Sequence, residues 1–84
     1  MITKTITKRG VQTTHQKITD YTVNLVRGDI IAQIGSYTSA GASLTEFIGD
    51  LDQLIIPLND TNTPDMNYIE SQMLLDPRWQ GGTK

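Results

Sequence analysis

The residue types that carry acid–base and metal chemistry are scarce in this sequence. His15 is the only histidine, and there is no cysteine. His15 lies in a polar stretch, residues 12–16, which has too little apolar content to be buried, and no Ser-His-Asp or His-Glu pattern accompanies it. A catalytic zinc ion needs about three histidine, cysteine or carboxylate ligands. The sequence therefore predicts no catalytic residue and no metal site, and it assigns His15 to an exposed or turn position.

Two pairs of carboxylates could in principle act as acid and base, Asp50 with Asp52 and Asp60 with Asp65. Catalysis at neutral pH requires a carboxyl group whose pKa is shifted by burial, and nothing in the sequence buries these four. The loop that carries Asp60 and Asn62 begins like a calcium loop, but no glutamate follows at the twelfth position. The glycines form no phosphate-binding motif. We expect solvated carboxylates, a polar turn, no cofactor and no small-molecule substrate.

Charge is distributed unevenly along the chain. Residues 1–30 hold five basic and two acidic residues, a balance of +3, whereas residues 31–84 hold two basic and seven acidic residues, a balance of −5, which together give the net charge of −2. This acidic balance, with no aromatic residues among the lysines, argues against nucleic-acid binding. The asymmetry predicts either ordinary solvation or contact between the basic part and the acidic part of a neighbouring subunit.

The elements that must position these side chains are mostly strands, beginning at the N-terminus. Residues 1–10 alternate isoleucine and lysine with threonine, which predicts an edge strand or an arm for strand addition, ending in a turn at Arg9-Gly10. This segment has no apolar leader, and nowhere does the chain hold about 18 consecutive apolar residues. We therefore expect neither a secretion signal nor a membrane span.

Residues 17–38 give the clearest pattern, that of a β-hairpin. Tyr21, Val23 and Leu25 share one face of the first strand, and Gly28-Asp29 suits a two-residue type II′ turn. A loop of small residues follows at 39–43.

Further strands are predicted within residues 44–58, with a turn at Gly49-Asp50 and Pro57 at the end of an edge strand. A helix over 44–55 is the alternative, which Gly49 and the adjacent β-branched residues Ile55 and Ile56 disfavour.

One helix is predicted over residues 64–75. Thr63, Pro64 and Asp65 form a helix start, and a stripe of Met66, Ile69 and Met73 can pack on the sheet. The helix ends before Asp76-Pro77, and residues 76–84 form a tail. Trp79 is the one large side chain of this tail, and it requires a pocket in its own core or in a neighbour.

The length of 84 residues and the 37% content of hydrophobic residues predict a single domain with a thin core. A domain of this size often depends on disulfides, metals or association, and here association remains. The expected fold class is α+β, mainly β: a small antiparallel sheet, an extended N-terminal strand or arm, and one C-terminal helix.

The order of these elements resembles that of small structural proteins of tailed bacteriophages. The resemblance is carried by a threonine-rich first strand, by "DYTVNLV" turning into "IIAQIGSYTSAGA", and by a helix "DMNYIESQMLL" that ends in "DPRWQGG". It implies a tail, baseplate or fibre-attachment component of the virion, made in the host cytoplasm. The implied partners are other virion proteins or copies of the chain itself.

These expectations define a function and the residues that would carry it. We expect a non-enzymatic virion subunit, an adaptor or decoration protein that acts through protein–protein packing. The alternative is a small soluble phage-encoded inhibitor or regulator that binds one host protein through an acidic surface formed by Asp60, Asp65, Glu70 and Asp76. Because aromatic residues and arginine dominate interface energies, the interface candidates are Tyr21, Tyr37, Tyr68, Arg78 and Trp79, with Ile2 and Ile6 of the N-terminal strand.

Overall fold

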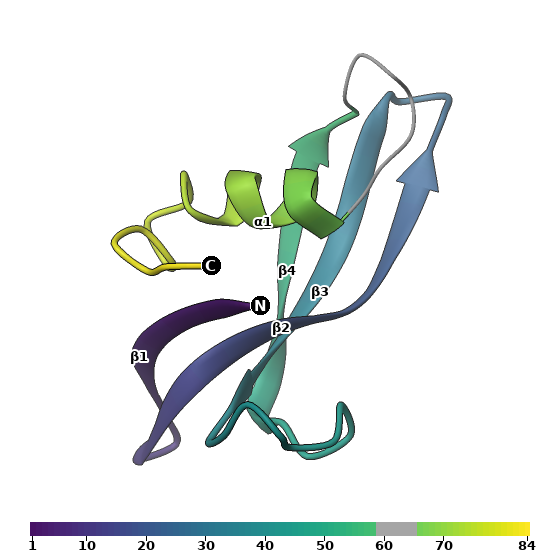
Figure 1. The fold of residues 1–84 in the computed structure, drawn as a ribbon. Coiled ribbons are helices and arrows are strands. Elements are labelled where there is room, and N and C mark those ends of the chain that lie inside the picture. The colour runs from purple at the N-terminus through teal and green to yellow at the C-terminus, as the bar shows by residue number, and fades with distance from the viewer. Residues whose placement is uncertain (59–65) are drawn as a thin grey trace.

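The computed structural model describes residues 1–58 and 66–84 and has the expected class, mainly β with one helix near the C-terminus. Its strands are β1 (Ile2–Lys8), β2 (Val11–Asn24), β3 (Asp29–Tyr37) and β4 (Ile48–Pro57), and its helix is α1 (Met66–Met73). The strands form one antiparallel sheet in the order β1-β2-β3-β4 (Figure 1). The N-terminal strand and β4 are therefore the two edge strands.

The β1–β2 connection confirms the turn expected at Arg9-Gly10. Lys8 pairs with Val11, which leaves these two residues as the loop. Both have positive φ angles, 50° and 79°, as in the type I′ turn that matches the twist of a hairpin.

The β2–β3 hairpin is also confirmed, but its turn differs from the prediction. Asn24 pairs with Asp29, so the loop has four residues, 25–28, and Leu25 lies in it rather than on the strand face. Gly28 closes the loop with a φ of 72° and donates its N–H to the Asn24 carbonyl at 2.8 Å. The positive φ that favoured glycine is present, but at the last loop position.

Residues 12–16, expected to be exposed, form the first part of β2, so that prediction is wrong. Thr13 and Gln16 are fully buried. A bulge explains the burial: the β1–β2 register shifts between Thr3 and Ile6, and this disrupts local backbone pairing. Polar side chains can be buried beside this bulge because they form hydrogen bonds with backbone carbonyl groups of β1.

The prediction for residues 44–58 is half correct. The second strand exists as β4, whereas 44–47 form turns and irregular structure, and the helical alternative for 44–55 is wrong. Gly49, expected in a turn between two strands, lies inside β4, where the register with β3 shifts. Its φ of 74° allows the strand to bend there.

The helix ends at Met73, before the predicted end at residue 75, and its predicted start at 63–65 lies outside the described residues. Ile69 and Met73 are fully buried, but Met66 is 46% exposed and does not belong to the packing stripe. Trp79 joins Ile69 and Met73 in the core cluster and has no exposed surface. The predicted tail is therefore folded onto the body.

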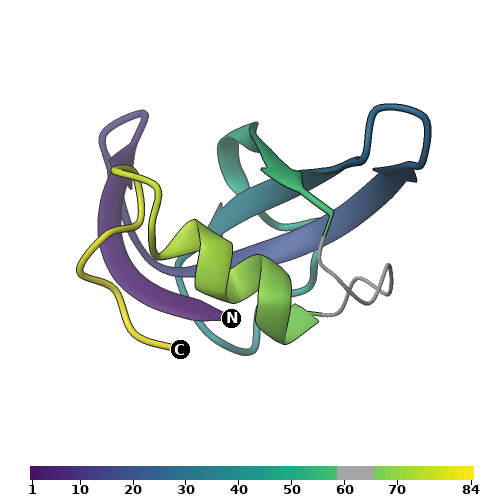
Figure 2. The same ribbon diagram turned by 90° about the horizontal axis from the view of Figure 1, so that it is seen from above.

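The sheet curls, and α1 lies across its inner side (Figure 2). The two edge strands approach each other where β1 ends and β4 begins, since a Cβ built on Gly49 would lie 3.5 Å from the Cβ of Lys8. At the other end of β1, α1 and the C-terminal residues occupy the space beside the strand. The fold is thus a half-barrel, closed at one end by its own edge strands and at the other by residues 66–84.

Candidate interaction surfaces

Those residues singled out for acid–base chemistry that lie in the described part of the chain are not brought together into a site. His15 is half-buried in β2 rather than in a turn, and its Nδ1 lies 2.8 Å from Thr14 Oγ1. Across residues 1–58 and 66–84 there is neither a pocket nor a cluster of three metal-ligating side chains. In the same part of the chain, no helix is long and apolar enough to span a membrane.

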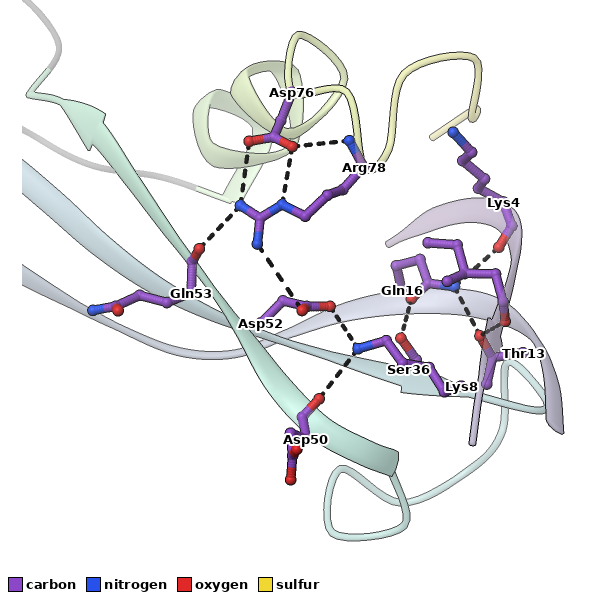
Figure 3. A network of polar contacts seen from close by, with 11 residues as sticks. Lys4, Lys8, Thr13, Gln16, Ser36, Asp50, Asp52, Gln53, Asp76 and Arg78 are labelled. Carbon is purple, nitrogen blue, oxygen red and sulfur yellow. Dashed lines mark hydrogen bonds and ion pairs between the residues drawn. The ribbon is translucent and has the colours of Figure 1, made fainter. Parts of the chain in front are cut away.

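Asp50 and Asp52 form ion pairs with Arg9 and Lys8 where the end of β1 meets the start of β4, and Figure 3 shows the contacts of Lys8. Lys8 Nζ lies 2.7 Å from Asp52 Oδ2 and donates to the Asp50 carbonyl at 3.2 Å. Arg9 reaches Asp50 at 3.3 Å, but both side chains are mostly solvated. The basic part of the chain therefore meets the acidic part within one molecule, which is an intramolecular version of the contact expected between subunits. Asp60 and Asp65 lie outside the described residues.

A buried polar network joins β1, β2 and β3 (Figure 3). Gln16 Nε2 donates to the Lys4 carbonyl at 2.9 Å, and its Oε1 accepts from Ser36 Oγ at 2.6 Å. Thr13 Oγ1 donates to the Ile6 carbonyl at 2.6 Å. The two carbonyl groups belong to the bulged part of β1, so buried side chains replace the missing ladder bonds. Sequence reasoning missed this network because polar residues normally indicate exposure.

Residues 76–84, here named the C-terminal strap, connect the two edges of the sheet. Arg78 anchors the strap to β4: it donates to the Gln53 carbonyl at 3.0 Å and to both carboxylate oxygens of Asp76 at 3.0 and 3.2 Å. Hydrogen bonds from Arg78 lower the pKa of Asp76, and the same carboxylate raises that of Arg78. The guanidinium also lies 4.3 Å from the ring centroid of Trp79.

At β1 the strap pairs by backbone. Thr3 and Thr83 exchange two hydrogen bonds of 2.6 and 3.0 Å, and Lys4 Nζ donates to the Gln80 carbonyl at 2.5 Å. A Cβ on Gly82 would lie 2.8 Å from Ile2 Cγ2 and 3.1 Å from the Thr3 carbonyl oxygen. Only glycine fits this close approach, which explains why glycine stands at position 82, in the segment "DPRWQGG".

The free edge of β4 is covered in a different way. Gln53, Ile55 and Pro57 direct their backbone groups away from β3, since these alternate along an antiparallel strand. Arg78 takes the Gln53 carbonyl, and Tyr68 Oη donates to the Pro57 carbonyl at 2.5 Å. Proline has no N–H to offer. Each edge is therefore partly occupied, at Thr3 on β1 and at Gln53 and Pro57 on β4, which hinders the addition of a foreign strand at these positions.

The outer face of the sheet is partly covered by residues 38–47. Tyr37 lies on this face, is fully buried, and donates from its hydroxyl to the Leu44 carbonyl at 2.6 Å. Burial raises its pKa. Lys17 Nζ lies 4.7 Å from the centre of the Tyr37 ring and donates to the carbonyls of Ala40 and Ala42 at 2.8 and 2.7 Å. Lys17 thus connects β2 to the loop of small residues at 39–43.

Apolar side chains remain exposed at the tip of the β2–β3 hairpin, far from β1 (Figure 1). Leu25 is 74% exposed and Val26 is 98% exposed. The loop does not require either one, because Asn24 Oδ1 accepts from the Arg27 N–H at 3.0 Å and Gly28 closes the turn. The sequence did carry a signal for this exposed tip, because two apolar residues stand where turns favour polar ones. The assignment of Leu25 to the strand hid this signal.

The interface candidates from the sequence separate into two groups. Ile2, Tyr37 and Trp79 have no exposed surface, so in this conformation they serve the chain's own packing. The other candidates keep some exposed surface, and they are Ile6, Tyr21, Tyr68 and Arg78. Among these, Tyr68 and Arg78 are bonded to β4, whereas Tyr21 is 40% exposed on the hairpin.

Comparison with known proteins adds no further identification. No protein-family model matches the chain, and no match is found among curated proteins or solved structures.

Proposed function

We propose that this chain is a non-enzymatic virion subunit, a tail or baseplate adaptor or a decoration protein, that acts by packing against another protein. The observation that carries the proposal is the apolar tip of the β2–β3 hairpin. Leu25 and Val26 are exposed although neither the turn nor the core needs them. Exposed apolar side chains at a protruding position favour contact with a partner.

The surfaces that the chain itself covers also favour contact near the tip of the β2–β3 hairpin. Thr83 pairs with the edge of β1 at Thr3, Arg78 and Tyr68 bond to the edge of β4, and α1 lies across the inner side of the sheet (Figure 2). On the outer face, Ile55 pairs with Ile31 beyond the part that residues 38–47 cover, and it is 58% exposed. Contact through side chains near the tip is therefore favoured over strand addition through an edge.

The alternative, an inhibitor with an acidic surface, has less support. Of its four proposed carboxylates, Glu70 is only 6% exposed and lies against the amino group of Met1, and Asp76 is paired with Arg78. Asp60 and Asp65 lie outside the described residues. The remaining described acidic residues on the body are mostly matched by basic ones, so no continuous negative track supports this reading.

The test is fractionation of particles from the cells that encode the chain. The wild-type chain should sediment with purified particles, and a Leu25→Ser, Val26→Ser variant should remain in the low-mass fraction. Leu75→Ser is the matched control, because Leu75 is also apolar and 72% exposed but lies beyond α1. A wild-type chain that never enters particles refutes the virion role, and one that migrates with a single small host protein favours the inhibitor.

A further inference from the structure

The C-terminal strap holds its own shape. Backbone hydrogen bonds run from Trp79 and Gln80 to the Asp76 carbonyl at 3.0 and 2.9 Å, and from Gly82 to the Trp79 carbonyl at 3.1 Å. Arg78 also bonds to Asp76 within the same segment. These bonds lie within the strap, so they do not depend on which body the strap covers.

The surface that receives the strap is formed by β1 and β4, which are distant from it in sequence, and by α1, which directly precedes it. β1 contributes Thr3 and Lys4, and β4 contributes Gln53. Lys84 Nζ reaches Ser71 Oγ of α1 at 2.8 Å. Trp79 is buried in the cluster that contains Ile2 and Met73. None of these contacts requires that strap and body belong to the same molecule.

One short turn decides which body the strap covers. Leu75 donates to the Gln72 carbonyl at 3.1 Å and Asp76 to the Met73 carbonyl at 3.0 Å, and these bonds turn the chain back after α1. Leu75 is 72% exposed, so its side chain adds little to the core. The turn is thus separable from the contacts that hold the strap in place.

We propose that the surface under the strap is a self-recognition site that also accepts the strap of a second copy, so that two chains interlock by exchanging residues 76–84. The second copy is the fitting occupant because its strap carries the same Trp79 anchor and the same Gly82, which the approach to Ile2 demands. Exchange of an identical segment creates each contact again without a new interface.

Concentration determines which form is populated. A short connection gives an intramolecular partner an effective concentration on the order of millimolar, so isolated chains at micromolar concentration keep their own strap. Copies packed side by side in an assembly reach comparable local concentrations, and there the exchange becomes competitive. This inference does not depend on the hairpin tip or on a virion, since it concerns a different surface.

Leu75→Pro tests the proposal in the full-length chain. Proline removes the N–H that bonds to Gln72 and disfavours helical backbone at Leu74, while every contact of the strap with the body stays available. We expect the variant to have twice the monomer mass by analytical ultracentrifugation, with the native fluorescence of buried Trp79. Leu75→Ser keeps the N–H and should remain monomeric.

Each other result overturns the proposal. A monomer with exposed Trp79 shows that the surface does not accept a second strap, a monomer with buried Trp79 shows that the turn is dispensable, and a dimer with exposed Trp79 is joined elsewhere. If Leu75→Pro does not fold, the wild-type chain is refolded at high concentration from a mixture of isotope-labelled and unlabelled copies. Dimers with an intermolecular contact between Thr3 and Thr83 are expected, and their absence refutes the exchange.

Discussion

Replacing Gln16 should cost the fold much of its stability, although a buried glutamine invites replacement by an apolar residue. In Gln16→Leu, the Lys4 carbonyl and the Ser36 hydroxyl lose the partners that lie 2.9 and 2.6 Å away. Each buried polar group without a partner costs about 1–3 kcal/mol. Two such groups cost about 2–6 kcal/mol together, and leucine recovers about 1–2 kcal/mol through its greater apolar burial, so the loss in the free energy of unfolding should centre on about 2.5 kcal/mol.

The assay is urea unfolding followed by circular dichroism, with a double-mutant cycle as the control. With a slope of about 1 kcal/mol per molar urea, the midpoint of Gln16→Leu should fall by about 2.5 M. Ser36→Ala alone orphans Gln16 Oε1 and should cost about 1–3 kcal/mol. In the double variant the hydroxyl is gone, so its cost should be smaller than the sum of the single changes.

An additive cycle would refute the network. So would a stable Gln16→Leu variant with an unchanged midpoint, because that result would mean that the Lys4 carbonyl finds water or another donor when the amide is removed.

Three further changes test other contacts. Gly82→Ala should lower the free energy of unfolding by about 1–3 kcal/mol, because the added methyl group overpacks against Ile2 and Thr3. Gly41→Ala is the control: nothing lies within 4 Å of its added Cβ, so it should change the free energy of unfolding by about 0.5 kcal/mol or less. Equal effects of the two changes in thermal unfolding would contradict the close approach at Gly82. Asp76→Asn keeps the shape of the side chain but removes its charge. Because the pKa of Asp76 is lowered in the fold, the ion pair stabilises the protein at pH values above the ordinary pKa of 3.8, and this contribution disappears as the pH falls below 3.8. Unfolding curves should show wild type about 0.5–1 kcal/mol more stable than the variant at neutral pH, and a difference that persists at the lowest pH would rule out the charge as its cause. Burial raises the pKa of Tyr37 above 10.0, so the unfolded chain loses the hydroxyl proton at a lower pH than the folded chain, and the free energy of unfolding should fall as the pH rises past that value. In Tyr37→Phe this alkaline loss of stability, measured by ultraviolet absorbance and unfolding, should be smaller. An unchanged dependence of stability on pH would show that another group causes the loss.

Local patterns predicted the strands well where one face alternates regularly. The period-two threonine pattern of β1 and the β2–β3 hairpin follow from side chains that need only their neighbours in the strand. The turn at Arg9-Gly10 follows from local backbone preferences in the same way.

The remaining differences come from contacts between distant residues. Residues 44–47 do not form a strand because their backbone serves another purpose: the Leu44 carbonyl accepts from Tyr37, and Phe47 packs over Gly35. Gln16 is buried because of a bulge in β1 that no pattern within β2 reveals. The candidate surface at Leu25 was missed because a hairpin loop of four residues was read as a turn of two.

Different contacts dominate at the two ends of the half-barrel. Lys8 and Asp52 join the edge strands by charge, whereas Trp79 fills the other end by apolar burial. Salt screens exposed ion pairs, and sulfate strengthens apolar burial. Because the Lys8–Asp52 pair is only partly exposed, sulfate should weaken it slightly while it strengthens the burial of Trp79, and dilute buffer should do the reverse. Solvent composition should thus change the relative stability of the two ends of this small sheet.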